Sequence, residues 1–195
     1  MSDVAWSSAA LTQGRYPTEL EADIVVHSGT TLHLRPIRAT DAEKLVAFHQ
    51  RLSSGSIYRR YFSFHPVLTE QEVAYFTQVD YVNRLAFVVE DGSDLVAVGR
   101  YDAKPTTTSA EVAFIVRDDY QHLGIGTKLL DALAAAALER GITTFTAETF
   151  AENRGMLAVF HRSAFPVTTT FESRGPVTVR FPINQTKSKN APAPQ

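Results

Sequence analysis

The chain has 195 residues, of which 44% are hydrophobic and 21% are charged, and this balance predicts one globular domain with a substantial core. The formal net charge of −2 gives no global attraction to nucleic acid or to an anionic membrane. Cysteine is absent, the histidines lack close metal-ligand spacing, and neither a run of 18 apolar residues nor a signal-peptide pattern occurs, so we expect a cytoplasmic protein without disulfides, metal or membrane span.

The first part of the chain predicts an arm followed by a hairpin. Residues 1–22 are rich in Ser, Ala and Thr without periodicity, and they are expected to form a mobile N-terminal arm. The β-prone runs Asp23–His27 and Thr31–Arg35 flank Ser28-Gly29 and predict a hairpin. The folded domain is therefore expected to begin at residue 23.

Three helices are predicted after this hairpin. Thr40 with Glu43, and Thr69 with Glu72, have the spacing of a capping box, which marks the starts of the first and third helices. The second is a short helix over Ser56–Phe62. Apolar side chains recur at helical spacing on the first and third helices, namely Leu45, Phe48 and Leu52 on the first and Val73 and Phe76 on the third.

The second half of the chain alternates strands and helices. Leu85–Glu90 and Leu95–Tyr101 predict a hairpin, and Ala110–Val116 a further strand. A long helix is expected from about Gly126 to Arg140. The remaining elements are a strand, a helix and two closing strands: Thr144–Thr149, Asn153–Ser163, Val167–Phe171 and Val177–Phe181. This order predicts an α/β domain with a mixed sheet over residues 23–183, and residues 184–195 are expected to be a disordered tail.

Two glycines, Gly124 and Gly126, lie where the long helix begins. A helix N-terminus favours an anion, and a residue without Cβ lets a ligand approach the backbone. The dinucleotide fingerprint does not fit because position 129 is Leu, and the P-loop does not fit because Thr127 follows Gly126. A tight turn or an ordinary loop remains open as a plain structural explanation.

The segment Gln121-His-Leu-Gly-Ile-Gly matches the pattern Gln/Arg-x-x-Gly-x-Gly/Ala and resembles the loop with which GNAT acetyltransferases hold the pyrophosphate of acetyl-CoA. The resemblance covers Asp23 to Phe181 and implies a single-domain GNAT fold, with a mixed, mostly antiparallel central sheet flanked by helices. It also implies acetyl-CoA as co-substrate, no metal, and cofactor binding by Phe114, Ile115, Val116, Gln121, His122, Leu123, Gly124, Ile125, Gly126, Thr127 and Asn153. Asn153 would touch the pantetheine arm, and it also suits a helix N-cap.

Three segments in the N-terminal half resemble one particular subfamily of GNAT acetyltransferases. Leu34–Arg38, Ser56–Phe62 and Val79–Arg84 resemble the Pat-type bacterial protein lysine acetyltransferases. This resemblance implies a protein acceptor, an AMP-forming acyl-CoA synthetase whose lysine receives the acetyl group. A small-amine N-acetyltransferase and a catalytically silent acyl-CoA-binding module remain alternatives, because a fold does not fix a function.

Glu111 is the candidate general base for deprotonating the acceptor amine. The strand Ala110–Val116 is apolar except for this residue, which shares a face with Ala113 and Ile115. We therefore expect a partly desolvated carboxylate whose pKa is raised toward the working range. The alternative is a structural ion pair with Arg100, and Glu148 and Asp80 are the fallback carboxylates.

The sequence departs from the family at its general acid. Many GNAT enzymes carry a tyrosine that protonates the departing thiolate, and Phe160 stands at that position here. His161 or Ser163 would be substitutes, but helix geometry is equally compatible with their pointing to solvent. Without cysteine, direct transfer in a ternary complex is the expected mechanism.

Overall fold

The computed structural model describes residues 14–171 and 175–187. Most of the predicted arm and tail, residues 1–13 and 188–195, lies outside this range. The described part of the arm is ordered, because Thr18–Leu20 form a short 3₁₀ helix and the Tyr16 hydroxyl donates to Glu21 at 2.7 Å. The described part of the tail is tied to the domain by Lys187, whose N–H donates to the carbonyl of Ala164.

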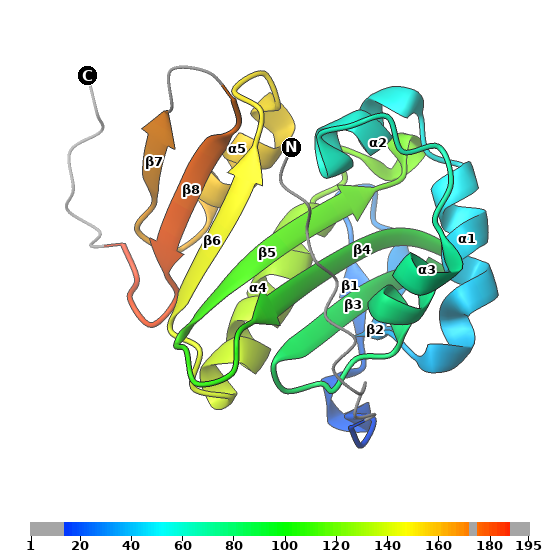
Figure 1. The fold of residues 1–195 in the computed structure, drawn as a ribbon, viewed down its shortest axis with the longest axis horizontal. Coiled ribbons are helices and arrows are strands. Elements are labelled where there is room, and N and C mark those ends of the chain that lie inside the picture. Colours follow the sequence, from blue (N-terminus) through cyan, green and yellow to red (C-terminus); the bar gives the residue numbers. More distant parts are fainter. Residues whose placement is uncertain (1–13, 172–174, 188–195) are drawn as a thin grey trace.

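One eight-stranded sheet runs through the molecule, in the order β1-β2-β3-β4-β5-β6-β8-β7 (Figure 1). Neighbouring strands are antiparallel except β5 and β6, which are parallel. The predicted mixed, mostly antiparallel sheet is therefore confirmed. The strands are β1 (Ala22–Val25), β2 (Thr31–Pro36), β3 (Arg84–Asp91), β4 (Asp94–Ala103), β5 (Ser109–Val116), β6 (Thr144–Thr149), β7 (Thr168–Phe171) and β8 (Val177–Pro182).

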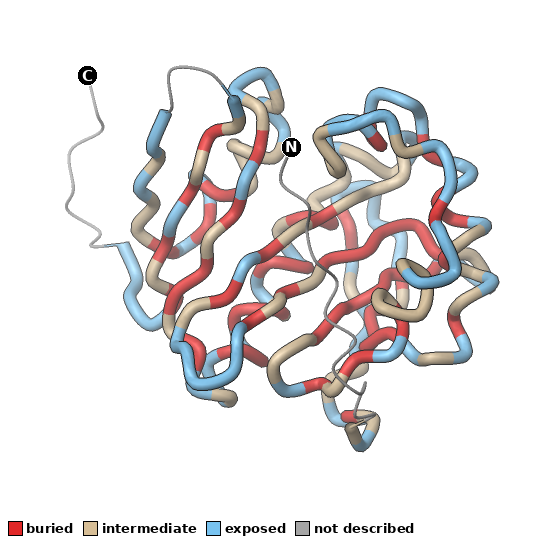
Figure 2. Tube along the Cα trace, viewed as in Figure 1, coloured by how far each residue is buried: buried red, intermediate tan, exposed pale blue. Residues whose placement is uncertain are grey.

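Helices cover both faces of the sheet. They are α1 (Ala42–Gln50), α2 (Ser54–Tyr61), α3 (Glu70–Thr77), α4 (Ile125–Glu139) and α5 (Arg154–Arg162). Helix α4 packs against β3, β4 and β5, and α1 packs against β4 on the opposite face. Buried residues follow the central strands in Figure 2, so the core lies between the sheet and these helices. Within the described residues, no helix is both long and apolar enough to cross a membrane.

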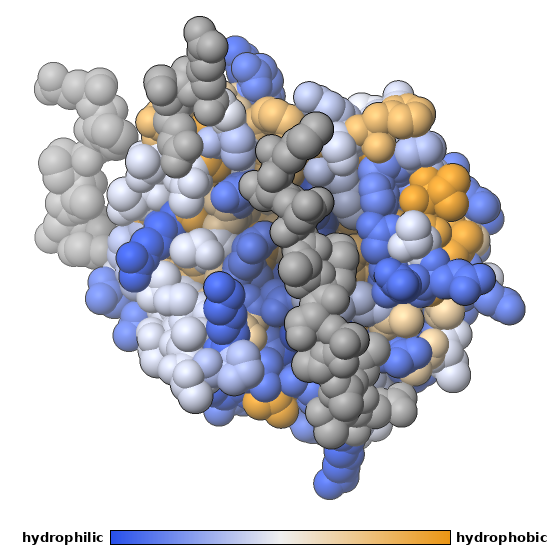
Figure 3. All heavy atoms as spheres, viewed as in Figure 1, coloured by the Kyte–Doolittle hydropathy of each residue, from blue (hydrophilic) through white to orange (hydrophobic). Residues whose placement is uncertain are grey.

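The surface gives little sign of a large apolar interface on the face viewed in Figure 1. Figure 3 shows mostly hydrophilic side chains there, with apolar ones in separate small groups among the atoms that are not grey. The exposed large apolar side chains of the described residues lie on several different elements: Val25, Tyr58, Phe64, Val67, Val82, Leu138 and Phe171. Scattered exposed apolar residues of this kind are normal for a globular protein.

The two halves of the sheet separate between β5 and β6 (Figure 1). These strands pair only from Ser109 opposite Thr144 to Glu111 opposite Thr146. Beyond that point β5 continues to Val116, hydrogen-bonded to β4 on its other side. Among the described residues, the carboxyl-terminal half of β5 therefore has no strand partner on the β6 side, and the wedge between the strands opens directly after Glu111.

One predicted helix start is confirmed and another is wrong. Thr69 and Glu72 form the capping box of α3, with the Thr69 N–H donating to the Glu72 carboxylate at 2.8 Å. At α1 a 3₁₀ turn over Ala39–Asp41 comes first, and the N-cap is Asp41 instead of Thr40. Asp41 accepts from the N–H of Arg38 at 2.7 Å, so its carboxylate takes the role predicted for Glu43.

A buried cluster of charged side chains explains why Asp41, and not Thr40, is the N-cap of α1. Arg35, whose side chain is 3% exposed, donates to Asp41 at 2.7 and 2.8 Å and to Glu90 at 2.8 Å through two nitrogens. Lys44 of α1 completes the cluster with a 2.7 Å bond to Glu90. The cluster joins β2, β3 and the start of α1.

Candidate active site

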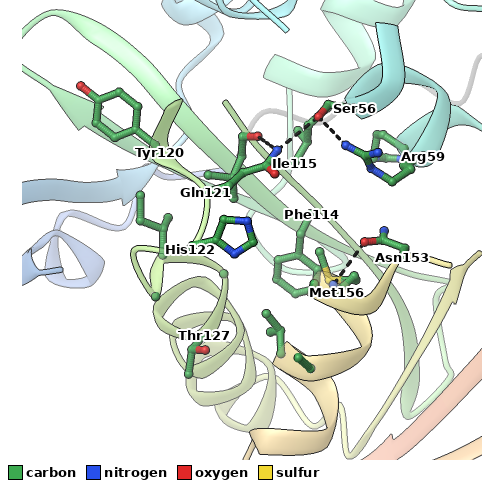
Figure 4. A pocket seen from close by; sticks show the side chains of 18 of the residues that line it. Ser56, Arg59, Phe114, Ile115, Tyr120, Gln121, His122, Thr127, Asn153 and Met156 are labelled. Carbon is green, nitrogen blue, oxygen red and sulfur yellow. Dashed lines mark hydrogen bonds between the residues drawn. The ribbon is translucent and has the colours of Figure 1, made fainter. Parts of the chain in front are cut away.

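A cavity of about 400 Å³ lies in the wedge beside β5 (Figure 4). Its walls come from the carboxyl-terminal half of β5, the loop before α4, the first turn of α4, the length of α5 and helix α2, with His27 of the β1–β2 hairpin. All the residues predicted to bind the cofactor line it except Leu123, whose carbonyl accepts from the N–H of His27 at 3.0 Å. The fold thus brings the end of β5, most of the loop before α4 and Asn153, which lie apart in the sequence, around one opening.

The amino end of α4, which follows this loop, has no side-chain cap. Gly124 occupies the N-cap position with φ of 84°, and no side chain caps the helix there. The N–H groups of the first turn of an α-helix have no partner within the helix. The amino end of α4, which lines the cavity, therefore offers backbone donors and a partial positive charge to an anion.

The two glycines of this loop have a packing role as well. A Cβ at position 124 would lie 2.7 Å from Nε2 of His27, and one at position 126 would lie 3.2 Å from a methyl group of Val159. The space that a side chain would take is thus filled by the β1–β2 hairpin and by α5. Packing against His27 and the positive φ both favour glycine at position 124, whereas a Cβ at position 126 would require Val159 to shift by only a few tenths of an ångström.

Asn153 caps α5, as the structural alternative predicted. Its Oδ1 accepts from the N–H of Met156 at 3.2 Å, and its Nδ2 donates to Thr149 at 3.1 Å. The residue also lines the cavity (Figure 4), so the cap leaves it beside the space that a ligand would fill. Its contact with a pantetheine arm remains a prediction.

Glu111 lies at the vertex of the wedge, and its environment differs from the prediction. It is the last residue of β5 to pair with β6, and it stands opposite Asp102 on β4. Its side chain is exposed, so the expected partial desolvation is wrong. The reason is that alternation sets only the face on which a side chain lies, whereas burial requires another element packed over that face, and Glu111 lines an open hollow there. The alternative pairing with Arg100 is not found either, since Arg100 lies 3.5 Å from Asp102 instead.

A second, smaller hollow of about 40 Å³ joins Glu111 to the main cavity. Glu111 and Glu148 line it from the two sides of the wedge, and both are exposed. Five residues line both spaces, which therefore meet at them: Arg59, Arg60, Phe114, Asn153 and Met156. A donor molecule in the large cavity and an acceptor beside Glu111 would come together at this junction.

Asp80, the other fallback carboxylate, lines neither space. Its carboxylate accepts from the N–H groups of Val82 at 2.9 Å and Arg84 at 2.8 Å, and from Asn83 at 3.1 Å. Burial tends to raise the pKa of Asp80, but these hydrogen bonds outweigh it and lower the pKa. Asp80 is therefore a fixed carboxylate that shapes the turn before β3.

Phe160 is buried in the core, and it is also one of the residues that line the smaller hollow beside Glu111. Its side chain is 1% exposed and packs against Phe114 and Phe181, with ring centroids 6.0 and 5.4 Å apart. The proposed substitutes lie elsewhere, because the Ser163 hydroxyl donates to the carbonyl of Phe160 at 2.7 Å and His161 faces Thr169 at 3.4 Å. Neither lines the cavity or the smaller hollow.

Phe160→Tyr is expected to reduce stability without increasing the rate of acyl transfer. The added hydroxyl would enter a buried aromatic cluster, and an unsatisfied polar group there costs about 1–3 kcal/mol. Urea unfolding and steady-state transfer assays on both proteins measure the two effects. A clear gain in kcat would contradict this prediction, since it would mean that the hydroxyl reaches the leaving group.

The chain is similar in sequence to known acetyltransferases. Residues 55–165 match the model of the acetyltransferase (GNAT) family. The chain is 32% identical over 142 residues to acetyltransferase Pat of Mycolicibacterium smegmatis, which covers 71% of this chain and 42% of Pat. It is 33% identical over 135 residues to an acetyltransferase of Pseudomonas aeruginosa, covering 66% of this chain and 71% of the relative. The match to Pat thus spans less than half of that protein.

A solved structure supports the same grouping. The GNAT domain of S. lividans PAT superposes with a TM-score of 0.81 at 38% identity, covering 86% of this chain and 99% of that chain. The agreement in fold therefore extends over nearly all of the described residues.

Proposed function

This chain belongs to the GNAT family of acetyltransferases, and we propose that it transfers an acetyl group from acetyl-CoA to the side-chain amine of a lysine in a target protein. We further propose that the target is an AMP-forming acyl-CoA synthetase. The resemblance of three N-terminal segments to Pat-type enzymes, and the similarity to Pat itself, support this acceptor over a small amine.

The observation that carries the proposal is the opening between β5 and β6. Pairing stops at Glu111, so β5 has no strand partner from Val112 to Val116 on the side of the cavity within the described residues, and only the carbonyl of Val116 is bonded there, to the Gln121 amide. An extended amide-containing chain such as pantetheine can pair with a strand edge of this kind. The uncapped amino end of α4 lies at the same cavity and suits the pyrophosphate. The site thus fits the two chemically different parts of acetyl-CoA.

Glu111 is proposed as the general base. A lysine amine with a pKa of about 10.4 must lose its proton before it attacks, which costs on the order of 4–5 kcal/mol at pH 7. Because Glu111 is exposed at the vertex of the wedge, an acceptor side chain arriving from solvent can reach it. The amine nitrogen forms the bond to the acetyl carbon, the carbon–sulfur bond breaks, the thiolate leaves, and the proton passes to Glu111.

The proposal is tested by incubating the protein with labelled acetyl-CoA and a purified AMP-forming acyl-CoA synthetase. Labelling of a single synthetase lysine, lost when that lysine is replaced by arginine, is the expected result. Labelling of small amines alone would overturn the protein acceptor. Binding of acetyl-CoA without transfer to any amine would support the silent acyl-CoA-binding module.

A further inference from the structure

Helix α2 forms one wall of the cavity, and its residue Arg59 lines this wall (Figure 4). Arg59 lines both the large cavity and the smaller hollow beside Glu111. The helix comes from the N-terminal half of the chain, far in sequence from the loop before α4 and from α5. A side chain of the N-terminal half therefore reaches the place where donor and acceptor meet.

One end of α2 is fastened to the connection between β5 and α4. Ser53, the N-cap of α2, donates to Asp118 through its N–H at 2.9 Å and through its hydroxyl at 2.7 Å. The Ser56 hydroxyl donates to the same carboxylate at 2.8 Å. Burial opposes ionisation of Asp118, but the hydrogen bonds from Ser53 and Ser56 outweigh it and lower the pKa of this carboxyl. Asp118 is thus ionised at neutral pH and holds the first turn of α2.

The other end of α2 contacts the loop that follows β6. The ring of Tyr58 stacks on Phe150 with centroids 5.3 Å apart and planes 7° apart. Phe62, directly after the helix, lies 4.9 Å from the same ring. Because Phe150 is on the far side of the wedge, α2 spans the opening between the two halves of the sheet. Arg59 lies between these two anchored ends.

Ser56 connects the anchor to the guanidinium. Its hydroxyl is buried, donates to Asp118, and accepts from Nη2 of Arg59 at 3.1 Å and from Nε2 of Gln121 at 3.2 Å (Figure 4). The Gln121 amide also donates to the carbonyl of Val116 at 3.1 Å. The Ser56 hydroxyl therefore orients Arg59, and it is fixed in turn by its hydrogen bonds to Asp118 and Gln121. A guanidinium carries five N–H donors, and no carboxylate among the described residues forms an ion pair with this one, so donors are left for a ligand.

We propose that Arg59 binds the carbonyl oxygens of the pantetheine–thioester arm of acetyl-CoA, and that Ser56 and Asp118 are the positioning residues that hold it there. This inference rests on the proposed function. The arm is favoured over the phosphates because Arg59 lines both spaces together with Phe114 and Asn153. His122, Gly124 and Thr127, at the amino end of α4, line the large cavity only.

Displacement of labelled acetyl-CoA by two unlabelled donors tests the proposal: acetyl-CoA itself and S-acetyl-pantetheine, which lacks the nucleotide and the pyrophosphate. Arg59→Ala is expected to weaken binding of both donors by about tenfold, the lower range for a hydrogen bond to a charged group. Arg59→Lys should retain part of the affinity, because it keeps the charge but not the planar fork. Arg51→Ala is the matched control, since Arg51 pairs with Asp94 outside both spaces.

The positioning role is tested by a double-mutant cycle. Ser56→Ala should weaken both donors less than Arg59→Ala does, and it should add little when Arg59 is already alanine. Ser56→Thr, which keeps the hydroxyl, should restore binding. A loss confined to acetyl-CoA would place Arg59 on the phosphates and overturn the proposal, and so would unchanged binding of both donors by Arg59→Ala and Arg59→Lys. Failure of the unmodified protein to bind acetyl-CoA at all would instead overturn the proposed function.

Discussion

Replacing Glu111 by glutamine is expected to lower kcat for acetyl transfer by about 10²–10⁴-fold, the usual contribution of a positioned general base. Glutamine keeps the shape of the side chain but cannot take the proton from the acceptor amine. The affinity for acetyl-CoA should not change, because Glu111 lines the smaller hollow and not the large cavity. Single-turnover transfer of labelled acetyl groups and calorimetric titration with acetyl-CoA measure the two quantities separately.

Glutamine substitutions at two other glutamates serve as controls for the effect of Glu111→Gln. Glu148→Gln changes the other carboxylate of the same hollow, on the opposite side of the wedge. Glu139→Gln changes an exposed carboxylate at the end of α4, beside Arg140, and should behave like the unmodified protein. If the large loss of kcat followed Glu148→Gln and Glu111→Gln were as active as the unmodified protein, the base would be Glu148. Full activity of both variants would mean that neither carboxylate of this hollow acts as the general base.

Features encoded in short stretches of sequence could be predicted closely. The Thr69–Glu72 capping box and the N-cap of α5 at Asn153 involve residues three positions apart, and both are present. The predicted hairpins and the strand before α4 are also observed. In each case the signal and the structure lie within a few residues of each other, so little depends on the rest of the fold.

Features that depend on distant partners could not be predicted. Thr40 and Asp41 are neighbouring cap candidates, and the choice is made by Arg35, whose buried guanidinium also binds Glu90, 55 residues along the chain. Likewise Ser53 and Asp118 are 65 residues apart, so the anchoring of α2 leaves no local pattern.

The exposure of Glu111 shows the same limit within a single strand. Alternation placed the side chain on the same face as Ala113 and Ile115, but burial of a face depends on which elements of the fold pack over it. The parallel pairing with β6 ends at Glu111 itself, and the register of two strands more than 30 residues apart is set by the whole sheet. Glu111 is therefore exposed although its place on the strand could be predicted.

Glu90→Gln is expected to lower the free energy of unfolding at pH 7 by about 3 kcal/mol, the lower range for breaking a buried ion pair. Of the two charged hydrogen bonds from Arg35 to Glu90, one would become a neutral bond to the amide oxygen of glutamine, and the other would be lost because the amide NH₂ cannot accept; the bonds to Asp41 and the carbonyl of Pro36 would remain. Lys44→Met is the matched control. It removes the other cation of the same carboxylate, but Lys44 is 42% exposed, so the loss should stay within about 1 kcal/mol. Urea unfolding of the three proteins measures the differences.

The pH dependence of this stability difference tests whether the charge of Glu90 causes it. Burial alone would raise the pKa of Glu90, but hydrogen bonds from Arg35 and Lys44 outweigh it and lower the pKa from 4.5 to about 2. A carboxyl whose pKa is lower in the folded state stabilises the protein above its unfolded pKa, and this contribution is lost as the pH falls through the folded value. The stability difference between the unmodified protein and Glu90→Gln should therefore be full above about pH 4.5 and shrink toward pH 2. A difference that stays constant over this range would mean that the glutamine acts through packing, and that the ion cluster joining β2, β3 and α1 does not depend on the charge of Glu90.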